Sequence, residues 1–196
     1  MNKDYTKILC NILSQIGTTD HIRPGDIPNI DLYMDQVTSF MDEHLKNSKR
    51  YEDDKILTKT MINNYAKNKL LPPPVKKRYS KEHMLVLIFI YYFKGFLPLN
   101  DISSILKPIN ERFFNSDKEF GIEDIYSEVY ELGKEQIGKI CRDIMESYHA
   151  AANSQPTCPE EDQEFLQLFS FICMLSFDIY IKKEVIEKMI DSLPDL

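Results

Sequence analysis

The sequence has few glycines and no closely paired cysteines, and both shortages narrow the classes of protein it can encode. Six glycines in 196 residues are few for an all-β fold, which needs many tight turns. None of the four cysteines belongs to a Cys-x-x-Cys pair or lies next to a histidine at the spacing of a zinc site. We therefore expect free thiols in a reducing compartment, and we expect the protein to be cytoplasmic.

Sequence signatures of catalysis and of cofactor binding are also missing. The sequence contains no P-loop and no Gly-x-Gly-x-x-Gly segment. It has one Glu-x-x-His, at Glu146 and His149, whereas a di-iron bundle needs two copies and two further carboxylates. We therefore predict no catalytic residue, no metal site and no cofactor, and a protein that is not an enzyme.

No uninterrupted apolar run is long enough to cross a membrane, which takes about 18 residues. The run from Met84 to Phe93 has ten, and polar residues interrupt the apolar stretch from Phe165 to Ile181. We predict that both are buried core helices and expect no membrane partner. For the second stretch two interpretations stay open: the centre of a C-terminal bundle, or a two-fold dimer interface.

Positive charge is concentrated in one window of an otherwise acidic sequence. The formal net charge is −7, which by itself argues against binding to nucleic acid. Residues 55–81, however, contain eight basic residues and no aspartate or glutamate. This window is either a local DNA-binding surface or a solvated lysine-rich face.

The hydrophobic pattern is predominantly helical. Helices are predicted over residues 4–16, 31–46, 58–70, 80–94, 99–106, 122–152, 160–180 and 182–192. Three prolines at 72–74 end the 58–70 helix, and a short extended segment follows them. The predicted fold class is all-α with at most a small β wing.

The order of these elements is typical of a winged helix-turn-helix followed by a helical bundle. In that motif a recognition helix lays polar side chains in the major groove while its other face packs on the core. The 58–70 helix has both faces, and the basic segment PPPVKKRY after it has the properties of a wing. We divide the chain into an N-terminal helix and linker (1–30), a winged-helix domain (31–107) and a helical domain (108–196) for dimerisation or for an unidentified effector.

Part of the sequence resembles the DNA-binding half of MerR-type regulators. Their pattern is a helix with tyrosine, Leu-Leu-x-Pro, a basic wing ending in Arg-Tyr, an apolar helix, Gly-Phe and a short Leu-x-x-Ile helix. The matching residues are Tyr65, Leu70, Leu71, Pro72, Arg78, Tyr79, Gly95, Phe96, Leu99 and Ile102. Roughly residues 25–130 also resemble an uncharacterised bacterial family, domain of unknown function 1836, which brings no established activity.

The sequence departs from the MerR-type pattern in length and at single residues. One extra residue lies between Gly95 and Leu99, the 31–46 helix is longer than the family's, and the C-terminal part lacks the long polar antiparallel coiled coil of a typical MerR dimer. Asn63 replaces a usual arginine, Asn64 a frequent tyrosine, and Lys69 the glycine before Leu-Leu. Without that glycine, the left-handed turn into the wing must fall on Lys69 or Asn68, of which asparagine tolerates it better.

We expect a DNA-binding transcriptional regulator with double-stranded DNA and a second copy of the chain as partners, because winged-helix regulators commonly bind paired half-sites as dimers. The candidate groove contacts are Thr60, Asn63, Asn64 and Lys67. The candidate phosphate contacts are Lys59, Lys69, Lys76, Lys77 and Arg78, with Tyr79 packing or hydrogen-bonding near a phosphate. The alternative is a non-catalytic protein-interaction module that keeps the winged-helix shape without binding DNA, which the net charge favours.

Overall fold

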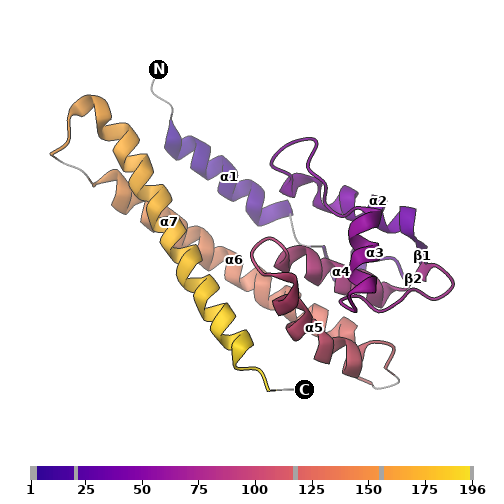
Figure 1. The fold of residues 1–196 in the computed structure, drawn as a ribbon. Coiled ribbons are helices and arrows are strands. Elements are labelled where there is room, and N and C mark those ends of the chain that lie inside the picture. Colours follow the sequence, from indigo (N-terminus) through magenta and orange to yellow (C-terminus); the bar gives the residue numbers. More distant parts are fainter. Residues whose placement is uncertain (1–3, 20–21, 117–118, 155–156, 195–196) are drawn as a thin grey trace. The chain divides into compact units, whose positions relative to one another are not determined.

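The structure is a computed structural model that describes residues 4–19, 22–116, 119–154 and 157–194. It is mainly helical, with one small antiparallel sheet of two strands, which confirms the predicted fold class (Figure 1). The chain divides into two compact units, the first extending to Leu132 and the second from Gly133 to Asp195.

The elements follow one another along the chain with short connections. The helices are α1 (Tyr5–Thr19), α2 (Met34–Leu45), α3 (Lys59–Lys67), α4 (Lys81–Phe93), α5 (Leu99–Phe113), α6 (Ile122–Ala152) and α7 (Glu160–Asp191). Two short 3-10 helices are η1 (Pro24–Asp26) and η2 (Lys46–Ser48), and the strands are β1 (Leu32–Tyr33) and β2 (Arg78–Tyr79). Most of the predicted helices are therefore present, with boundaries that differ by a few residues.

Helix α4 is the centre of the first unit. Every side chain from His83 to Ile90 is buried, so all faces of this part of the helix are covered by protein. A helix that is apolar all round requires such surroundings, and the predicted burial of the Met84–Phe93 run is confirmed for its first seven residues. Helix α2 adds one fully buried face to the same core, made by Val37, Met41 and Leu45 at helical spacing.

The beginning of α6 belongs to this core as well. Ile122 and Tyr126 are buried, and the Tyr126 ring packs edge-on against Phe89 with 5.5 Å between ring centroids. The Tyr126 hydroxyl donates a hydrogen bond of 2.6 Å to the Ile22 carbonyl, which fixes the segment before α2 to α6. Burial raises the pKa of the Tyr126 hydroxyl, so it stays a donor.

Helix α5 does not end before Pro108, as the sequence predicted, but continues through it to Phe113. Proline removes one backbone hydrogen bond from a helix interior. The helix is held on both sides of this position: Ile102 and Leu106 are buried before it, and the Asn110 side-chain amide donates to the Leu70 carbonyl after it, across 3.1 Å. Tertiary contacts thus compensate for the local cost.

Helix α7 is one continuous helix, so the predicted interruption near residue 181 is wrong. The ion pair between Lys182 and Asp178, 2.6 Å long, spans the predicted break from one turn to the next. The predicted burial of residues 165–181 is wrong too, because Phe171 is the only buried residue of α7. The apolar composition predicted a core helix, but the periodicity of a helix does not show which other segments pack against it.

Candidate nucleic-acid interface

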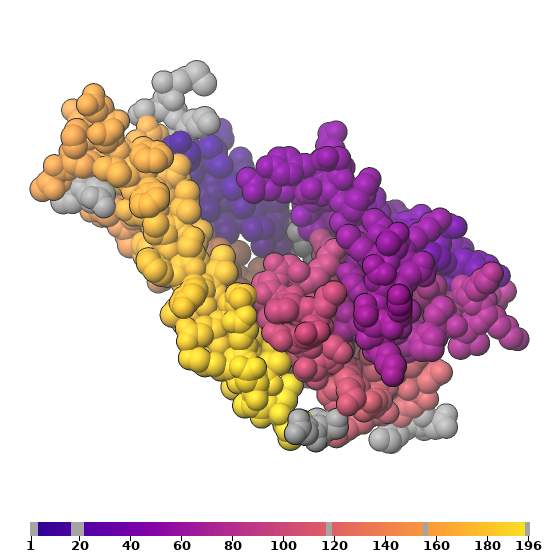
Figure 2. Space-filling view, in the orientation of Figure 1, coloured from indigo at the N-terminus to yellow at the C-terminus, as the bar shows by residue number. Residues whose placement is uncertain are grey.

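Helix α3 separates a buried face from a polar one. Thr58 caps its beginning, because its hydroxyl oxygen accepts a hydrogen bond of 3.2 Å from the Met61 backbone nitrogen. Ile62 and Tyr65 are buried beneath the helix, and burial raises the pKa of the Tyr65 hydroxyl. The predicted contact residues on α3 are all exposed, namely Lys59, Thr60, Asn63, Asn64 and Lys67. Figure 2 shows α3 (purple) at the surface of the first unit.

The end of α3 is a Schellman motif formed without glycine. Lys69 has a φ of 59°, in the left-handed region, which is one of the two positions predicted for this turn. The backbone nitrogen of Leu70 donates to the Tyr65 carbonyl across 2.9 Å, and that of Lys69 donates to the Ala66 carbonyl across 3.2 Å. The motif turns the chain sharply, so that Leu70 enters the core while Lys69 points its side chain to solvent.

The chain then forms a two-residue β-hairpin turn with a lysine at each central position. Val75 and Arg78 exchange backbone hydrogen bonds of 3.1 and 2.9 Å. Between them Lys76 and Lys77 have φ values of 50° and 63°. Two consecutive positive values are typical of a type I′ turn, which favours Asn-Gly because other residues are strained there by about 1–2 kcal/mol each. Two exposed lysines therefore occupy a tip whose backbone would be more stable with other residues.

Arg78 continues from this tip into the sheet and is held by Tyr33. Strand β2 pairs antiparallel with β1, so that Tyr33 faces Arg78 and Leu32 faces Tyr79. The Nε and Nη2 atoms of Arg78 donate to the Tyr33 hydroxyl across 3.2 and 3.1 Å, and the guanidinium lies 5.1 Å from the centre of the Tyr33 ring. Arg78 is exposed and oriented at once, which suits a contact to a phosphate.

Tyr79 follows Arg78 in strand β2, and its side chain is buried. Its side chain is 3% exposed, so of its two predicted roles it takes packing and not phosphate contact. Burial raises the pKa of its hydroxyl. The Tyr79 ring packs edge-on against His83 of α4, at 5.5 Å between centroids, which anchors β2 on the central helix.

The basic residues of the 55–81 window divide into paired and unpaired groups. Lys59 pairs with Asp35 at the beginning of α2, and Lys81 pairs with Glu123 across 2.6 Å. Among the residues that the structure describes, no carboxylate pairs with the four lysines of the α3 end and the hairpin tip. These are Lys67, Lys69, Lys76 and Lys77, and all four are exposed. Lys55, before α3, is also exposed and has no ion pair in the described residues, and the other free lysines gather at the C-terminal end of α3 and on the hairpin.

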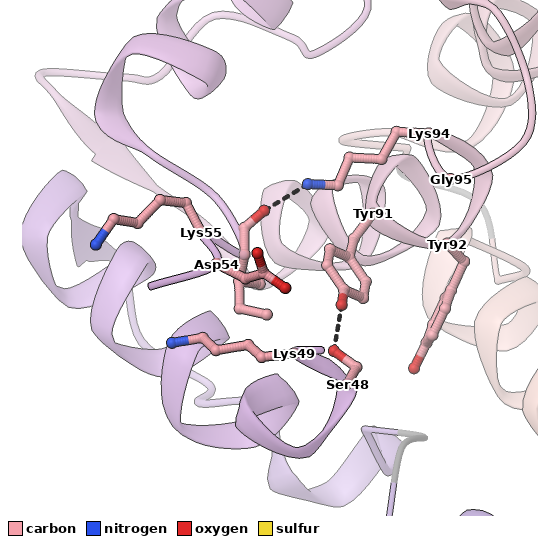
Figure 3. A pocket seen from close by; sticks show the side chains of 9 residues that line it. Ser48, Lys49, Asp54, Lys55, Tyr91, Tyr92, Lys94 and Gly95 are labelled. Atoms are coloured by element: carbon pink, nitrogen blue, oxygen red, sulfur yellow. Dashed lines mark hydrogen bonds between the residues drawn. The ribbon is translucent and has the colours of Figure 1, made fainter. Parts of the chain in front are cut away.

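The first unit also contains an open cavity of about 390 Å³ at the C-terminal end of α4 (Figure 3). Its lining residues are Ser48, Lys49, Asp54, Lys55, Ile56, Tyr91, Tyr92, Lys94 and Gly95. The Lys94 ammonium donates to the Ile56 carbonyl across 2.5 Å, and partial burial lowers the pKa of Lys94. Lys49 pairs with Asp42 across 2.6 Å. Two of its three lysines thus have partners within the protein, and we assign no ligand to the cavity.

A metal centre is not formed by the described part of the chain. No group of three or more histidine, cysteine, aspartate or glutamate side chains lies close enough together there to hold an ion.

The chain matches a protein-family model over residues 22–129, which is more than half of its length. This model describes a domain of unknown function, DUF1836. The chain belongs to that family. The match confirms the predicted family membership, and it includes α3, the hairpin and every residue proposed from the sequence to contact DNA. No curated protein and no solved structure matches the chain.

Sequence reasoning missed two residues of this DUF1836 segment that shape the surface, Tyr33 and Asp35. It placed Tyr33 inside a helix beginning at residue 31, whereas the chain is extended at Tyr33 and α2 begins at Met34, so that Asp35 lies in its first turn. The signal lies in Gln36, whose side-chain oxygen accepts a hydrogen bond of 2.8 Å from the Tyr33 backbone nitrogen. A glutamine three residues after a helix boundary is the second half of a capping box, and it marks the start of α2.

Proposed function

We propose that this protein is a non-catalytic, DNA-binding transcriptional regulator that uses α3 and the 75–78 hairpin as a MerR-like winged helix-turn-helix. The observation that carries the proposal is the hairpin tip, where Lys76 and Lys77 keep a strained left-handed backbone and expose two charges. Strain in a backbone persists where the surrounding structure and the function require it.

Phosphate binding would come from the hairpin and from the end of α3. Lys69, Lys76 and Lys77 are exposed and have no carboxylate partner in the described residues, and Arg78 is oriented by Tyr33. Such contacts position a protein on the duplex without reading its sequence, and they release counterions.

Base recognition would come from the exposed face of α3. An α-helix with its side chains is about 10–12 Å across, which suits a major groove about 12 Å wide. Asn63 and Asn64 are adjacent on the exposed face, and asparagine pairs with adenine through two hydrogen bonds. On the same helix Lys59, a candidate phosphate contact, is a weaker one because its charge is partly neutralised by Asp35.

The proposal is tested by a salt titration of binding to a short duplex of random sequence, followed by fluorescence anisotropy. The logarithm of the association constant should fall linearly with the logarithm of the salt concentration, by about 0.9 per phosphate contact. The double variant Lys76→Gln, Lys77→Gln should reduce this slope by about 1.8, since two contacts are lost. The variant Lys139→Gln, which removes an exposed lysine outside the family segment, is the matched control and should leave the slope unchanged.

An absence of binding at low salt would reject the proposal. If Lys139→Gln lowers the salt slope as much as the hairpin variant does, the assigned surface is rejected, because the slope would then depend on the net charge of the protein and not on the hairpin.

A protein-interaction module is the second candidate, and one observation favours it. Tyr33 and Val75 flank Arg78 at the hairpin and are 50 and 63% exposed, so the hairpin offers apolar surface as well as charge. An arginine between apolar side chains is typical of energetically important positions in protein interfaces. This candidate predicts no salt-dependent binding to random DNA.

A further inference from the structure

The two ends of the 75–78 hairpin meet at one buried side chain, that of His83 in α4. Pro73 lies shortly before the hairpin, and its carbonyl oxygen is 3.4 Å from the Nε2 atom of His83. Tyr79 follows the hairpin directly, and its ring packs edge-on against the imidazole at 5.5 Å between centroids. In the described part of the chain, no other histidine and no lysine, arginine, aspartate or glutamate is buried. A single titratable group therefore lies at the base of the hairpin.

The hairpin has little stability apart from this base. One pair of backbone hydrogen bonds, between Val75 and Arg78, closes its turn, and strands β1 and β2 have two residues each. Lys76 and Lys77 at the tip have left-handed backbones, which strain a residue that carries a side chain. An isolated two-stranded hairpin is marginally stable at best in water. The closed form therefore depends on the contacts that the two ends make.

The hydrogen bonds of His83 require an uncharged ring. Its Nδ1 atom accepts from the Ser80 backbone nitrogen across 3.0 Å and from the Ser80 hydroxyl across 2.8 Å. A ring nitrogen that accepts from a backbone N–H carries no proton, so the proton lies on Nε2, which faces the Pro73 carbonyl. One tautomer of the neutral ring thus bonds to Ser80 at one nitrogen and to Pro73 at the other.

The surroundings of the ring disfavour its charged form. Besides Tyr79, the Phe114 ring packs edge-on against the imidazole, at 4.7 Å between centroids. Among the described residues, Asp31 is the one carboxylate that favours the charged form, and the carbonyls of Pro72 and Pro73 act in the same direction. Burial outweighs all three and lowers the pKa of His83.

The other titratable groups next to this ring are neutral or engaged elsewhere. Tyr79 keeps its proton, because burial raises the pKa of its hydroxyl. On α4 itself, the Lys81 ammonium pairs with a glutamate of α6 across 2.6 Å. A carboxylate oxygen of Glu82 accepts from the Asn115 backbone nitrogen across 2.9 Å. Histidine is the side chain whose charge ordinarily changes in mild acid, so His83 is the group at this base that can respond to pH.

We propose that His83 is a pH-sensitive latch: its neutral ring holds the 75–78 hairpin closed, and its protonation releases the hairpin while the helical core stays folded. A proton on Nδ1 would point at the Ser80 backbone N–H, which cannot accept a hydrogen bond, so that bond is lost. The charged ring would also be buried against two aromatic rings, which is costly in free energy. It lowers this cost by moving toward solvent, and it then leaves both Pro73 and Tyr79.

This latch would make phosphate binding depend on pH. An open hairpin no longer pairs Arg78 with Tyr33, so the acid form would bind DNA less tightly. Added positive charge in acid has the opposite effect on binding to a polyanion, so the two causes differ in sign. This consequence rests on the DNA-binding function proposed above, whereas the latch itself does not.

The latch is tested by hydrogen exchange of the Val75 and Arg78 backbone amides, followed by NMR from neutral pH to about pH 5 and expressed relative to an unstructured peptide at the same pH. Because opening takes up one proton, the protection of both amides should fall about tenfold per pH unit between 6.5 and the lowered pKa of His83. When these amides have lost their protection, the amide of Ile88 in the middle of α4 should still be protected, because the core is still folded.

Two variants show whether His83 is responsible. His83→Gln accepts the bond from the Ser80 nitrogen but does not titrate, so its hairpin protection should not depend on pH. His44→Gln is the matched control: it removes a half-buried histidine of α2 and should keep the pH dependence of the wild type. Hairpin protection that is independent of pH in the wild type, or that equals the protection of Ile88 at every pH, would overturn the proposal without any variant. The same holds for an unchanged pH dependence in His83→Gln.

Binding to a duplex of random sequence separates the latch from the proposed function. At the pH at which half of the hairpins are open, the association constant of the wild type divided by that of His83→Gln should be about half its value at neutral pH. A hairpin that opens in acid, in a protein that does not bind DNA at low salt, would support the latch and reject the proposed function. DNA binding by a protein whose hairpin stays closed in acid would do the reverse.

Discussion

The backbone nitrogen of Ser80 donates a hydrogen bond of 3.0 Å to the Nδ1 atom of His83, one turn into α4. Because a backbone N–H only donates, Nδ1 carries no proton, and the proton of the neutral ring lies on Nε2. Nε2 then donates to the Pro73 carbonyl, 3.4 Å away, in the segment that leads to the hairpin. One buried imidazole therefore both caps the central helix and fastens the base of the hairpin to it.

This arrangement makes the stability of the first unit sensitive to acid. Burial lowers the pKa of His83 below the ordinary value of 6.5, although the carbonyls of Pro73 and Pro72 and the carboxylate of Asp31 oppose the shift. The unfolded chain therefore binds the proton at a higher pH than the folded chain does. The free energy of unfolding should be insensitive to His83 above pH 6.5 and should decrease as the pH falls below 6.5 toward the lowered pKa. Urea unfolding at a series of pH values measures this decrease.

The variant His83→Gln is the matched control for that measurement. Glutamine at this position accepts a hydrogen bond from the Ser80 nitrogen, as in an ordinary capping box, but does not titrate. The other histidines are unchanged in this variant. The loss of stability in acid should therefore be smaller than in the wild type, and an identical loss would show that His83 is not its source.

A second prediction concerns the end of α3. Lys69→Gly should raise the free energy of unfolding by about 1 kcal/mol, because glycine adopts the left-handed conformation at φ 59° without the strain of a side chain. Lys69→Gln keeps a side chain and should leave stability nearly unchanged, while both variants remove the same positive charge. Thermal unfolding measures the difference, and equal stabilities for the two would contradict the strain.

A third prediction tests the bond between α6 and the segment before α2. Tyr126→Phe leaves the Ile22 carbonyl without its buried donor and should lower the free energy of unfolding by about 1–3 kcal/mol. Tyr130, one turn further along α6, is half-buried, and Tyr130→Phe should change stability far less. Denaturant unfolding of the two variants gives the comparison, in which similar losses would argue against the importance of this hydrogen bond.

The features that could be predicted from the sequence are those that depend on local chemistry. The apolar run in α4 requires burial on all sides. The turn after α3 requires a left-handed residue, and because no glycine precedes Leu70, a residue with a side chain had to adopt that conformation. The exposed face of α3 likewise follows from its periodicity. In each case the information lies within one or two turns of chain.

The features that could not be predicted depend on contacts between distant segments. Strand β1 has two residues and exists because it pairs with β2, more than forty residues later. Helix α5 passes Pro108 because Asn110 is bonded to the Leu70 carbonyl. The exposure of α7 could not be predicted either, because its apolar pattern indicated a buried helix whereas only Phe171 of α7 is buried.

The last prediction separates the folding role of the hairpin from its proposed binding role. Replacing Lys76→Asn and Lys77→Gly provides the residues that a type I′ turn favours, and it relieves two left-handed lysines. The free energy of unfolding should rise by about 1–2 kcal/mol, because glycine removes the strain at position 77 while asparagine keeps part of it at position 76. The same variant should reduce the salt slope of DNA binding by about 1.8, because two phosphate contacts are lost.

The double variant Lys76→Gln, Lys77→Gln is the control, because it removes the same charges and keeps the strain. Its salt slope should fall by the same amount, and its free energy of unfolding should not rise. If the Lys76→Asn, Lys77→Gly variant is more stable than the wild type and binds DNA with the same affinity and salt slope, the two lysines are not needed at the tip for phosphate binding.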